Sequence, residues 1–454
     1  MAFIKFYSTN KKAPGVSFSE ALLKGLAPDK GLYMPEMIPA FSWDEIRSFT
    51  GKKYHEIAFE VISRFLKEQI DDNELLALIK DAYNFSVPLE RVYGNNWVMR
   101  LDQGPTASFK DFAARMMGRL MQYYIVRDKR NLLILTATSG DTGSAIANAF
   151  YKLDNIEVVV LFPENEISGR QRKQMTTLGE NVRIIALEGK FDDCQALVKE
   201  AFSDPDLDGL SLSSANSINI GRLIPQIVYY FFAFANLGKG IDNDNVIFSV
   251  PSGNFGDMMG GVLAKRMGLP VRKFVVAVNE NDEFPAFLYS GNYSRIEPSR
   301  NCLSSAMNVG HPSNLARLVA LYGGFMDEKG QIIDQPDMEM MREDIFSVSV
   351  TDEQTRESIR EAYNKYEVIL EPHGAVGWKG LTDYFKMENL PDGQLSVTLE
   401  TAHPAKFPEE IRQILNIDPD LPDSLTGLEG KVEYCTSLDN NYQQFKTFLQ
   451  ENYF

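Results

Sequence analysis

Three loops of this chain combine residues that could hold an amine, a carboxylate and a phosphate. The first contains Lys110 in the segment GPTASFKD (104–111). The others are the glycine-containing segments TSGDTGS (138–144) and PSGNFGD (251–257). A lysine amine can form a Schiff base with an aldehyde, and backbone amides at the start of a helix can bind anions. Together the loops suit an amino-acid substrate and a phosphorylated aldehyde cofactor, which is the chemistry of a pyridoxal-phosphate site.

Lys110 stands at the expected start of a helix. Ser108 is a plausible N-cap, and Asp111 suits the positively polarised first turn. The helix would bury an apolar face with four-residue spacing, formed by Phe112, Met116 and Leu120. Taken alone, a lysine here is typical of a surface residue that reaches water. The functional alternative is a partly desolvated amine that forms a Schiff base.

Each glycine-containing loop also has a plain structural interpretation. Residues 138–144 could bind a carboxylate through their amides, but a tight strand-to-helix turn needs no ligand. Residues 251–257 match neither GxxxxGK[ST] nor GxGxxG, although they could still surround one phosphate. The prediction therefore depends on the combination of the three loops.

Alternating apolar runs and helical patterns must position these loops. Short apolar runs predict buried strands at 131–137, 156–162, 182–187, 246–250 and 273–278, with helical patterns between them. This order predicts an α/β fold with two open, mainly parallel sheets covered by helices on both faces. Ligands of such sheets bind at the carboxyl ends of the strands, where the loops lie.

Composition excludes several other functions. The chain has 454 residues, and 46 Lys and Arg against 62 Asp and Glu give a net charge of -16 without any basic run. We therefore expect neither nucleic acid nor an anionic membrane as a partner. Three cysteines without CxxC and four histidines without HExxH predict no disulfide framework and no metal site. No long apolar segment opens the chain, and the apolar run 227–235 is too short to cross a bilayer, so we expect a cytoplasmic protein.

The ordered motifs of the chain resemble the threonine synthase family, within the tryptophan-synthase-like, fold-type-II class of pyridoxal-phosphate enzymes. The resemblance begins with residues 16–33 and extends over nearly the whole length. It is carried by GPTASFKDF, LTATSGDTGSA, SANSINIGRL, VPSGNFGD, EPHGAVG and TAHPAKF, in the order of the family. One departure is Ala107-Ser108, where relatives often carry more apolar residues.

The resemblance implies a role for each candidate site residue. Lys110 matches the lysine that holds pyridoxal 5'-phosphate and carries protons. Thr401 matches the hydroxyl that faces the pyridine nitrogen, where a neutral partner would leave that nitrogen largely unprotonated. The loop around the cofactor phosphate is matched by Gly253, Asn254, Phe255, Gly256 and Asp257. The loop that grips the substrate carboxylate is matched by Ser139, Gly140, Asp141 and Thr142. Asn216 and Arg222 match residues that bind the substrate phosphate, for which the planar donor fork of Arg is suited.

The same resemblance implies three units. Residues 1–95 would form a mostly helical N-terminal unit. Residues 96–235 would form a lobe with the Schiff-base lysine and the carboxylate-binding loop, and residues 236–454 a lobe with the phosphate loop and the pyridine-nitrogen partner. His373 and His403, each beside a proline, are expected to position backbone rather than to catalyse.

The activity implied is that of a carbon-oxygen lyase in threonine biosynthesis, which converts O-phospho-L-homoserine and water into L-threonine and phosphate as a monomer or homodimer. Enzymes of the same fold leave alternatives open: a phospholyase that makes no threonine, a hydroxy-amino-acid dehydratase, or a cysteine-synthase-like enzyme. A non-catalytic binding protein would usually lack the lysine. A nucleotide-binding oxidoreductase is disfavoured because no GxGxxG follows a strand.

Overall fold

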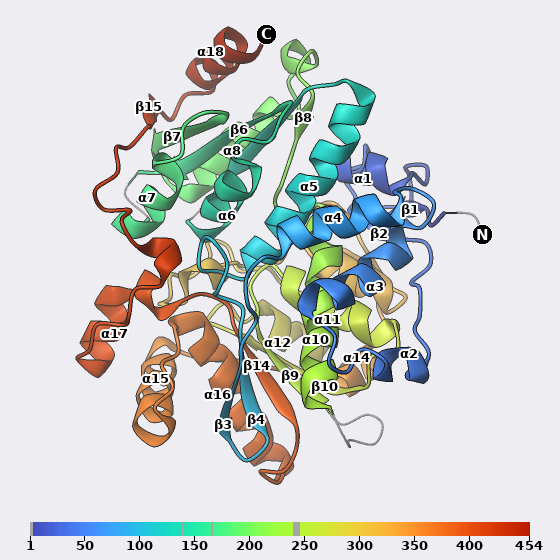
Figure 1. Ribbon diagram of the computed structural model, residues 1–454, viewed down its shortest axis with the longest axis vertical. Helices are drawn as coiled ribbons and strands as arrows, with labels where there is room; N and C mark the ends of the chain where they lie inside the picture. The colour runs from blue at the N-terminus through green and yellow to red at the C-terminus, as the bar shows by residue number, and fades with distance from the viewer. Residues whose placement is uncertain (1–2, 139, 165–166, 239–245) are drawn as a thin grey trace.

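The computed structural model describes residues 3–138, 140–164, 167–238 and 246–454. Two sheets, one above the other in Figure 1, organise the fold. In the upper, five-stranded sheet every pair of neighbours is parallel. Its strands, in spatial order, are β15 (Thr436–Asp439), β7 (Val182–Glu188), β6 (Ile156–Pro163), β5 (Leu132–Ala137) and β8 (Leu212–Ser213). The prediction of open, mainly parallel sheets is confirmed.

The lower sheet has six strands, and only its edge pair β3–β4 is antiparallel. Its spatial order is β13 (Ile345–Ser349), β10 (Val271–Val278), β9 (Val246–Pro251), β14 (Ser396–Glu400), β4 (Asn96–Arg100) and β3 (Leu89–Tyr93). Strands β9 and β14 are buried along their whole length, as expected for central strands of a sheet covered on both faces. They deliver the phosphate loop and Thr401 from their carboxyl ends.

Helices cover both faces of the upper sheet. Alternate residues of β5 point to opposite sides, so Ile134 belongs to one apolar core and Leu135 to another. The first core includes residues of α5 (Lys110–Asp128) and α6 (Asp141–Phe150), and the second includes residues of α8 (Phe191–Ala201) and α18 (Tyr442–Tyr453). A sheet buried in this way explains why β5 and β6 read as nearly continuous apolar runs.

The lower sheet is covered in the same manner. Val98, Ile247 and Val275 pack with α15 (Asp352–Tyr366), α16 (Pro372–Glu388) and α17 (Pro408–Leu415). The opposite face packs with α10 (Ile227–Leu237) and α11 (Gly256–Arg266). The lobe is completed by α12 (Glu283–Ser290), α13 (Leu315–Leu321), α14 (Met338–Asp344), β11 (Phe325–Met326) and β12 (Ile332–Asp334).

The N-terminal region is mostly helical, as predicted. Its two-stranded sheet pairs β1 (Phe6–Ser8) with β2 (Tyr33–Pro35). Its helices are α1 (Phe18–Lys24), α2 (Trp43–Arg47), α3 (Tyr54–Leu66) and α4 (Asp72–Ala82). The apolar face of α3 joins the same core as α10, so this region packs against the lower lobe.

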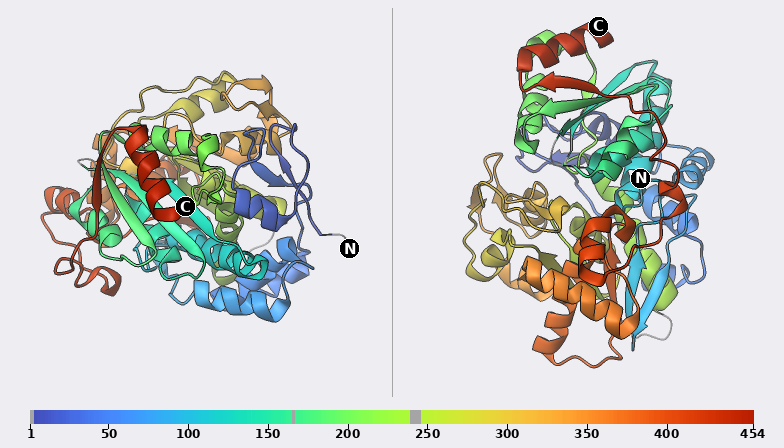
Figure 2. Two further views of the ribbon diagram at one scale, coloured as in Figure 1. Left: turned by 90° about the horizontal axis from the view of Figure 1, so that it is seen from above. Right: turned by 90° about the vertical axis from the view of Figure 1, so that its left-hand side faces the viewer.

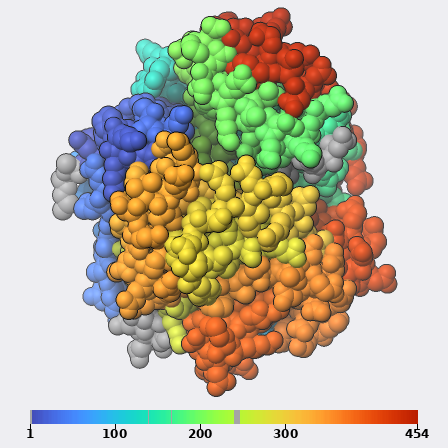
Figure 3. All heavy atoms as spheres, turned by 180° about the vertical axis from the view of Figure 1, so that it is seen from behind, coloured from blue at the N-terminus to red at the C-terminus, as the bar shows by residue number. Residues whose placement is uncertain are grey.

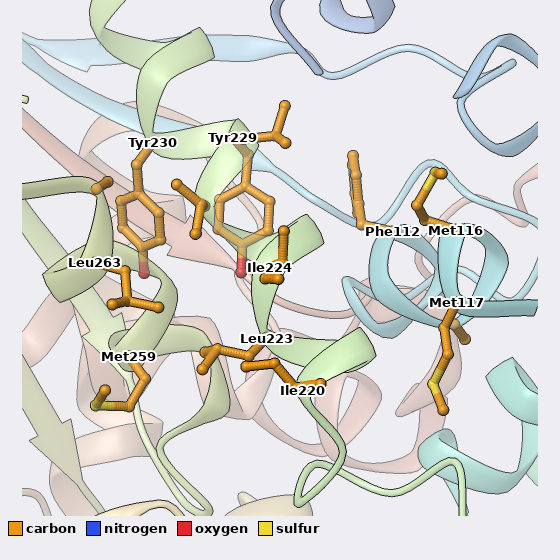
Figure 4. Close-up of a cluster of buried hydrophobic side chains, with 14 of the residues drawn as sticks. Phe112, Met116, Met117, Ile220, Leu223, Ile224, Tyr229, Tyr230, Met259 and Leu263 are labelled. Carbon is orange, nitrogen blue, oxygen red and sulfur yellow. The ribbon is translucent and has the colours of Figure 1, made fainter. Parts of the chain in front are cut away.

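A dense apolar cluster lies behind the loops of interest. Figure 4 shows α5 facing α9 (Ile220–Leu223), with α10 and α11 beyond it. The labelled members are Phe112, Met116, Met117, Ile220, Leu223, Ile224, Tyr229, Tyr230, Met259 and Leu263. Close packing of this kind fixes the ends of the helices, and the candidate site lies at those ends.

The C-terminal segment returns to the upper sheet after the lower lobe is complete. It adds β15 in parallel to β7, and Figure 2 shows it passing along that sheet to α18. Seen from behind in Figure 3, the C-terminal residues lie against the green residues at the top of the molecule. No helix among the described residues is long and apolar enough to cross a membrane.

Candidate active site

The start of α5 differs from the expected N-cap. The helix begins at Lys110 with Phe109 as its N-cap residue, and no side chain caps it. Ser108 instead forms a β-bridge with Ala402, so its backbone is committed to pairing with another segment. The carboxylate of Asp111 accepts hydrogen bonds from the amide and hydroxyl of Thr106, at 2.8 and 2.7 Å, and stabilises the turn before the helix.

This pairing places Lys110 beside Thr401. The Phe109 amide donates to the Thr401 carbonyl at 2.8 Å, and the His403 amide donates to the Ala107 carbonyl at 3.0 Å. The two segments lie far apart in the sequence and are joined by backbone hydrogen bonds. The mouth of α5 is therefore held against the carboxyl end of β14.

The environment of Lys110 is that of a desolvated amine. Its side chain is 13% exposed, and Nζ lies 3.8 Å from Asp141 Oδ2 and 5.0 Å from the centre of the Phe109 ring. Burial lowers the pKa of Lys110, and the charge of Asp141 offsets part of this effect. The interpretation as a surface lysine is wrong, because the side chain turns into the protein.

Lys406 is a second buried lysine at this point, and the sequence reasoning missed it. Its side chain is 0% exposed, and Nζ lies 2.6 Å from Asp141 Oδ1 and 2.9 Å from the Thr106 carbonyl. Asp141 thus stands between Lys406 and Lys110, and also accepts from Gln171 Nε2 at 3.0 Å. These partners outweigh the effect of burial and hold the pKa of Asp141 well below its usual range.

The loop before α6 presents amides toward the same region. Gly140 has φ 131°, a conformation open to glycine, and an added Cβ would meet Gln171 Nε2 at 2.7 Å. Thr138 Oγ1 accepts from the amides of Gly140 and Gly143, at 3.0 and 2.7 Å. No described residue accepts from the amides of Asp141 and Thr142, which stand at the helix start and suit an anion. Ser139 lies outside the described residues.

Residues 253–256 form a second set of amides at the start of a helix. Phe255, at φ 62°, is the left-handed residue from which α11 begins. No described residue accepts from the amides of Gly253, Asn254, Phe255 or Gly256. Gly253 lies close to another segment, since an added Cβ would meet Met307 Cα at 3.0 Å. Amides arranged in this way fit one phosphate group of a cofactor.

Asp257 closes this loop but points away from it. Its Oδ1 accepts from the hydroxyls of Tyr229 and Tyr230, at 2.5 and 2.8 Å. Burial raises the pKa of Asp257 to about 6, although both tyrosines lower it. Asp257 therefore anchors α11 to α10 through its side chain.

Arg222 is a buried cation with few partners. Its Nη1 donates to the Ala215 carbonyl at 2.8 Å, while Nε has no partner. Arg222 forms no ion pair with a described residue, and burial lowers its pKa to about 10. Asn216, six positions before it, accepts from Thr136 Oγ1 at 2.5 Å. A buried guanidinium without an acidic partner fits an anionic ligand.

Asn314 and Arg317 connect the 253–256 loop to the segment before Arg222, and neither was predicted. Asn314 Nδ2 donates to the carbonyls of Asn254 and Ser217, at 2.9 and 3.3 Å. Arg317, which is fully buried, donates to Asn314 Oδ1 at 2.6 Å and to the Ile218 carbonyl at 2.6 Å. The phosphate loop and the segment that leads to Arg222 are therefore held by one network.

Thr401 has an acidic neighbour that was also missed. Its hydroxyl donates to Glu371 Oε1 at 3.1 Å. Glu371 is fully buried and caps the start of α16. The charges of Asp141, Arg222 and Glu371 all act on Lys110.

Three family models match the chain. They are the threonine synthase N terminus at residues 5–83, the pyridoxal-phosphate dependent enzyme at 85–401, and the C-terminal threonine synthase region at 374–449. The chain is 39% identical over 471 residues to threonine synthase of Pseudomonas aeruginosa, covering 99% of this chain and 98% of the relative. It is 40% identical over 423 residues to threonine synthase of Escherichia coli K12, covering 93% and 94%.

Solved structures agree with these matches. Pyridoxal-phosphate-bound threonine synthase from Brucella melitensis has a TM-score of 0.91 at 36% identity, with 99% of each chain covered. Threonine synthase from yeast has a TM-score of 0.91 at 32% identity, with 98% of each chain covered. The chain therefore belongs to the threonine synthase family of pyridoxal-phosphate-dependent enzymes.

Proposed function

We propose that this enzyme converts O-phospho-L-homoserine and water into L-threonine and phosphate at Lys110. The observation that carries the proposal is the pair of separate anion sites around the buried amine. The amides of 253–256 suit the phosphate of the cofactor, and Arg222 suits a second phosphate on the substrate. An enzyme that acts on a phosphate ester needs a second phosphate site. An enzyme that acts on serine or threonine does not need one.

The residues present can hold the cofactor. The 253–256 amides would bind its phosphate, Lys110 would bind its aldehyde carbon, and Thr401 would face its ring nitrogen. When bound, the cofactor supplies a ring that withdraws negative charge from the substrate carbon next to the amine. The chain supplies the remaining functions.

Substrate positioning would fall to groups that have hydrogen-bonding capacity left over. The amides of Asp141 and Thr142 would bind the substrate carboxylate, while Arg222 and Asn216 would bind its phosphate. Lys406 neutralises Asp141 at 2.6 Å, which lets a loop that contains a carboxylate accept an anionic substrate.

Lys110 would carry protons once the substrate amine has replaced it on the cofactor. Its lowered pKa leaves more of the amine in the neutral, proton-accepting form at neutral pH than an ordinary lysine would have. After it has taken a proton, its ammonium is stabilised by Asp141, 3.8 Å away. The same amine can therefore take a proton from one substrate carbon and return it to another.

The test is an assay of products. Purified enzyme with the cofactor should release phosphate and threonine in equal amounts from O-phospho-L-homoserine. Phosphate without threonine would instead identify a phospholyase, and ammonia from serine or threonine a dehydratase. Lys110→Ala should lose both the visible absorbance of the lysine-bound cofactor and threonine formation. The matched control is Lys24→Ala, because the Lys24 side chain is 46% exposed and pairs only with Glu20.

The phosphate site has its own test. Arg222→Lys keeps a positive charge but loses the planar donor fork. Hydrogen bonds to charged groups contribute about 1.5–3 kcal/mol, so we expect KM for the phosphorylated substrate to rise about 10- to 100-fold. The absorbance of the bound cofactor should stay unchanged. An unchanged KM would remove Arg222 from the substrate site.

A further inference from the structure

We propose that Glu371 fixes the proton of the Thr401 hydroxyl, so that Thr401 can only accept a hydrogen bond from the cofactor's ring nitrogen, which therefore carries a proton. This inference rests on the proposed function, in which Thr401 faces that nitrogen. It reverses the sequence-based expectation that a neutral hydroxyl leaves the nitrogen largely unprotonated. Glu371 acts here as a positioning residue.

The hydrogen bonds around Glu371 leave it only an accepting role. Oε1 accepts from the Gly374 amide at 2.9 Å and from Thr401 Oγ1 at 3.1 Å. Oε2 accepts from the His373 amide at 2.7 Å and meets His373 Nδ1 at 2.5 Å. Each oxygen thus has two neighbours, and both amides are necessarily donors.

The tautomer of His373 follows from the hydrogen bond at its Nε2 atom. The Ala306 amide donates to His373 Nε2 at 3.0 Å, so Nε2 carries no proton. A neutral imidazole with a free Nε2 has its proton on Nδ1. Nδ1 therefore donates to Glu371, and three of the four bonds to the carboxylate have a fixed direction.

The position of Glu371 suits an acceptor of hydrogen bonds. It is the N-cap residue of α16, a helix of 17 residues, and the start of a helix stabilises negative charge. The neighbouring Glu400 accepts from the Glu371 amide at 2.7 Å. Burial and the charge of Glu371 raise the pKa of Glu400 well above its usual range.

The other charged groups nearby do not change this assignment. Arg100 Nη1 lies 3.6 Å from Glu400 Oε1 and so faces Glu400. Burial raises the pKa of Asp102, and Arg100 lowers it. The acidic group that accepts a hydrogen bond from Thr401 is Glu371.

A threonine hydroxyl has one proton and two lone pairs. Glu371 accepts three bonds of fixed direction at the start of a helix. We therefore assign it as the acceptor of the fourth bond, so the Thr401 proton points to Glu371. Only lone pairs then remain toward the ring nitrogen. An unprotonated nitrogen would set lone pair against lone pair, whereas a protonated one forms a hydrogen bond. A protonated ring is also the stronger electron sink, which suits an enzyme that must remove protons from two neighbouring carbons.

The experiment is nitrogen NMR of the complete enzyme loaded with cofactor labelled with ¹⁵N in the ring. The wild-type signal should lie at the position of a protonated pyridine, and Glu371→Gln should move it to that of an unprotonated one. Thr401→Val should move it in the same way, while Thr401→Ser should keep it. The Thr401 variants retain Glu371, so they test the inference even if Glu371→Gln fails to fold.

Glu283→Gln is the matched control, because Glu283 is another buried glutamate and makes no contact with Thr401. It should leave the signal in place. A wild-type signal at the unprotonated position would overturn the inference, and so would equal shifts in the Glu283 and Glu371 variants. An enzyme that makes threonine with an unprotonated ring would refute this inference alone, whereas failure to bind the cofactor at Lys110 would refute the proposed function.

Discussion

Asp141 is a buried carboxylate that lies between two lysines. One carboxylate oxygen meets Lys406 at 2.6 Å and the other faces Lys110 at 3.8 Å. Lys406 and Asp141 form a buried ion pair whose charges balance without Lys110. The negative charge of Asp141 is therefore compensated by Lys406 whether or not Lys110 carries its proton.

Removing Lys406 should be costly. Lys406→Met leaves Asp141 buried without its closest counter-charge, and breaking a buried ion pair in this way costs about 3–5 kcal/mol. Urea unfolding of the enzyme measures this loss. Asp141→Asn in the same background should recover most of the stability, since no lone charge then remains. Lys24→Met, at an exposed pair, should change stability by less than about 0.5 kcal/mol; an equal loss in both variants would contradict the argument.

Asp257 should make stability depend on pH. Its pKa is raised from an ordinary 3.8 to about 6, so the unfolded chain releases this proton first as pH rises. The contribution of Asp257 to the free energy of unfolding is largest below about pH 4. About 3 kcal/mol of this contribution is lost between that pH and about pH 6. Asp257→Asn should lack this decline. Urea unfolding at pH 4 and pH 7, before the cofactor is added, compares the two proteins, and parallel pH dependences would contradict the assignment.

The sequence predicted some of these residues and not others. Lys110 stood out because it opens an apolar helix near two glycine-containing loops. Lys406 and Glu371 lie within the quoted motifs TAHPAKF and EPHGAVG, but their importance depends on contacts with Asp141 and Thr401. A charged residue among small and apolar ones in a loop after a strand was the available signal.

At the scale of elements, the apolar runs located strands well. The runs 131–137, 156–162 and 246–250 differ from β5, β6 and β9 by one residue at an end. The start of α5 was placed less well, because Ser108 was judged by local N-cap preference. Its backbone pairs with Ala402, which lies far away in sequence, and local preferences do not include such a partner.

The phosphate loop makes a prediction that belongs to this scale. Gly253→Ala places a Cβ 3.0 Å from Met307 Cα and 3.2 Å from the Ala306 carbonyl, so backbone must move and the amides of 253–256 lose their arrangement. Cofactor affinity should fall about tenfold or more, which corresponds to about 1.4 kcal/mol. Fluorescence titration with pyridoxal phosphate measures it. Gly169→Ala, where nothing lies within 4 Å of the added Cβ, should bind normally, and normal binding by Gly253→Ala would contradict the model of the loop.

At the scale of the whole molecule, each of the two large sheets contains strands from more than one of the expected units. The division into 1–95, 96–235 and 236–454 stays a prediction. The pairing shows that β4 joins β14 and that β15 joins β7. Packing between segments hundreds of residues apart decides which strands are neighbours, and a local pattern of apolar residues does not predict this pairing. The C-terminal return consequently ties the lobe that contains the lysine to the end of the chain.

This connection predicts a long-range effect on stability. Leu449 of α18 is fully buried in the core that includes β5 and β7, so Leu449→Ala should cost about 2–5 kcal/mol. Leu421→Ala, at a side chain that is 44% exposed, is the control and should have little effect. Because Lys110 and Asp141 lie on helices that pack on the opposite face of the same sheet, the Leu449 variant should keep the absorbance of the bound cofactor at low temperature and lose it at a lower temperature than wild type. Thermal scans that follow cofactor absorbance and far-ultraviolet circular dichroism together would show this. If α18 did not stabilise the sheet, cofactor absorbance would be lost at the wild-type temperature in both variants. If absorbance and circular dichroism are lost together at a lower temperature in the Leu449 variant, the C-terminal helix stabilises the sheet on which the site is built.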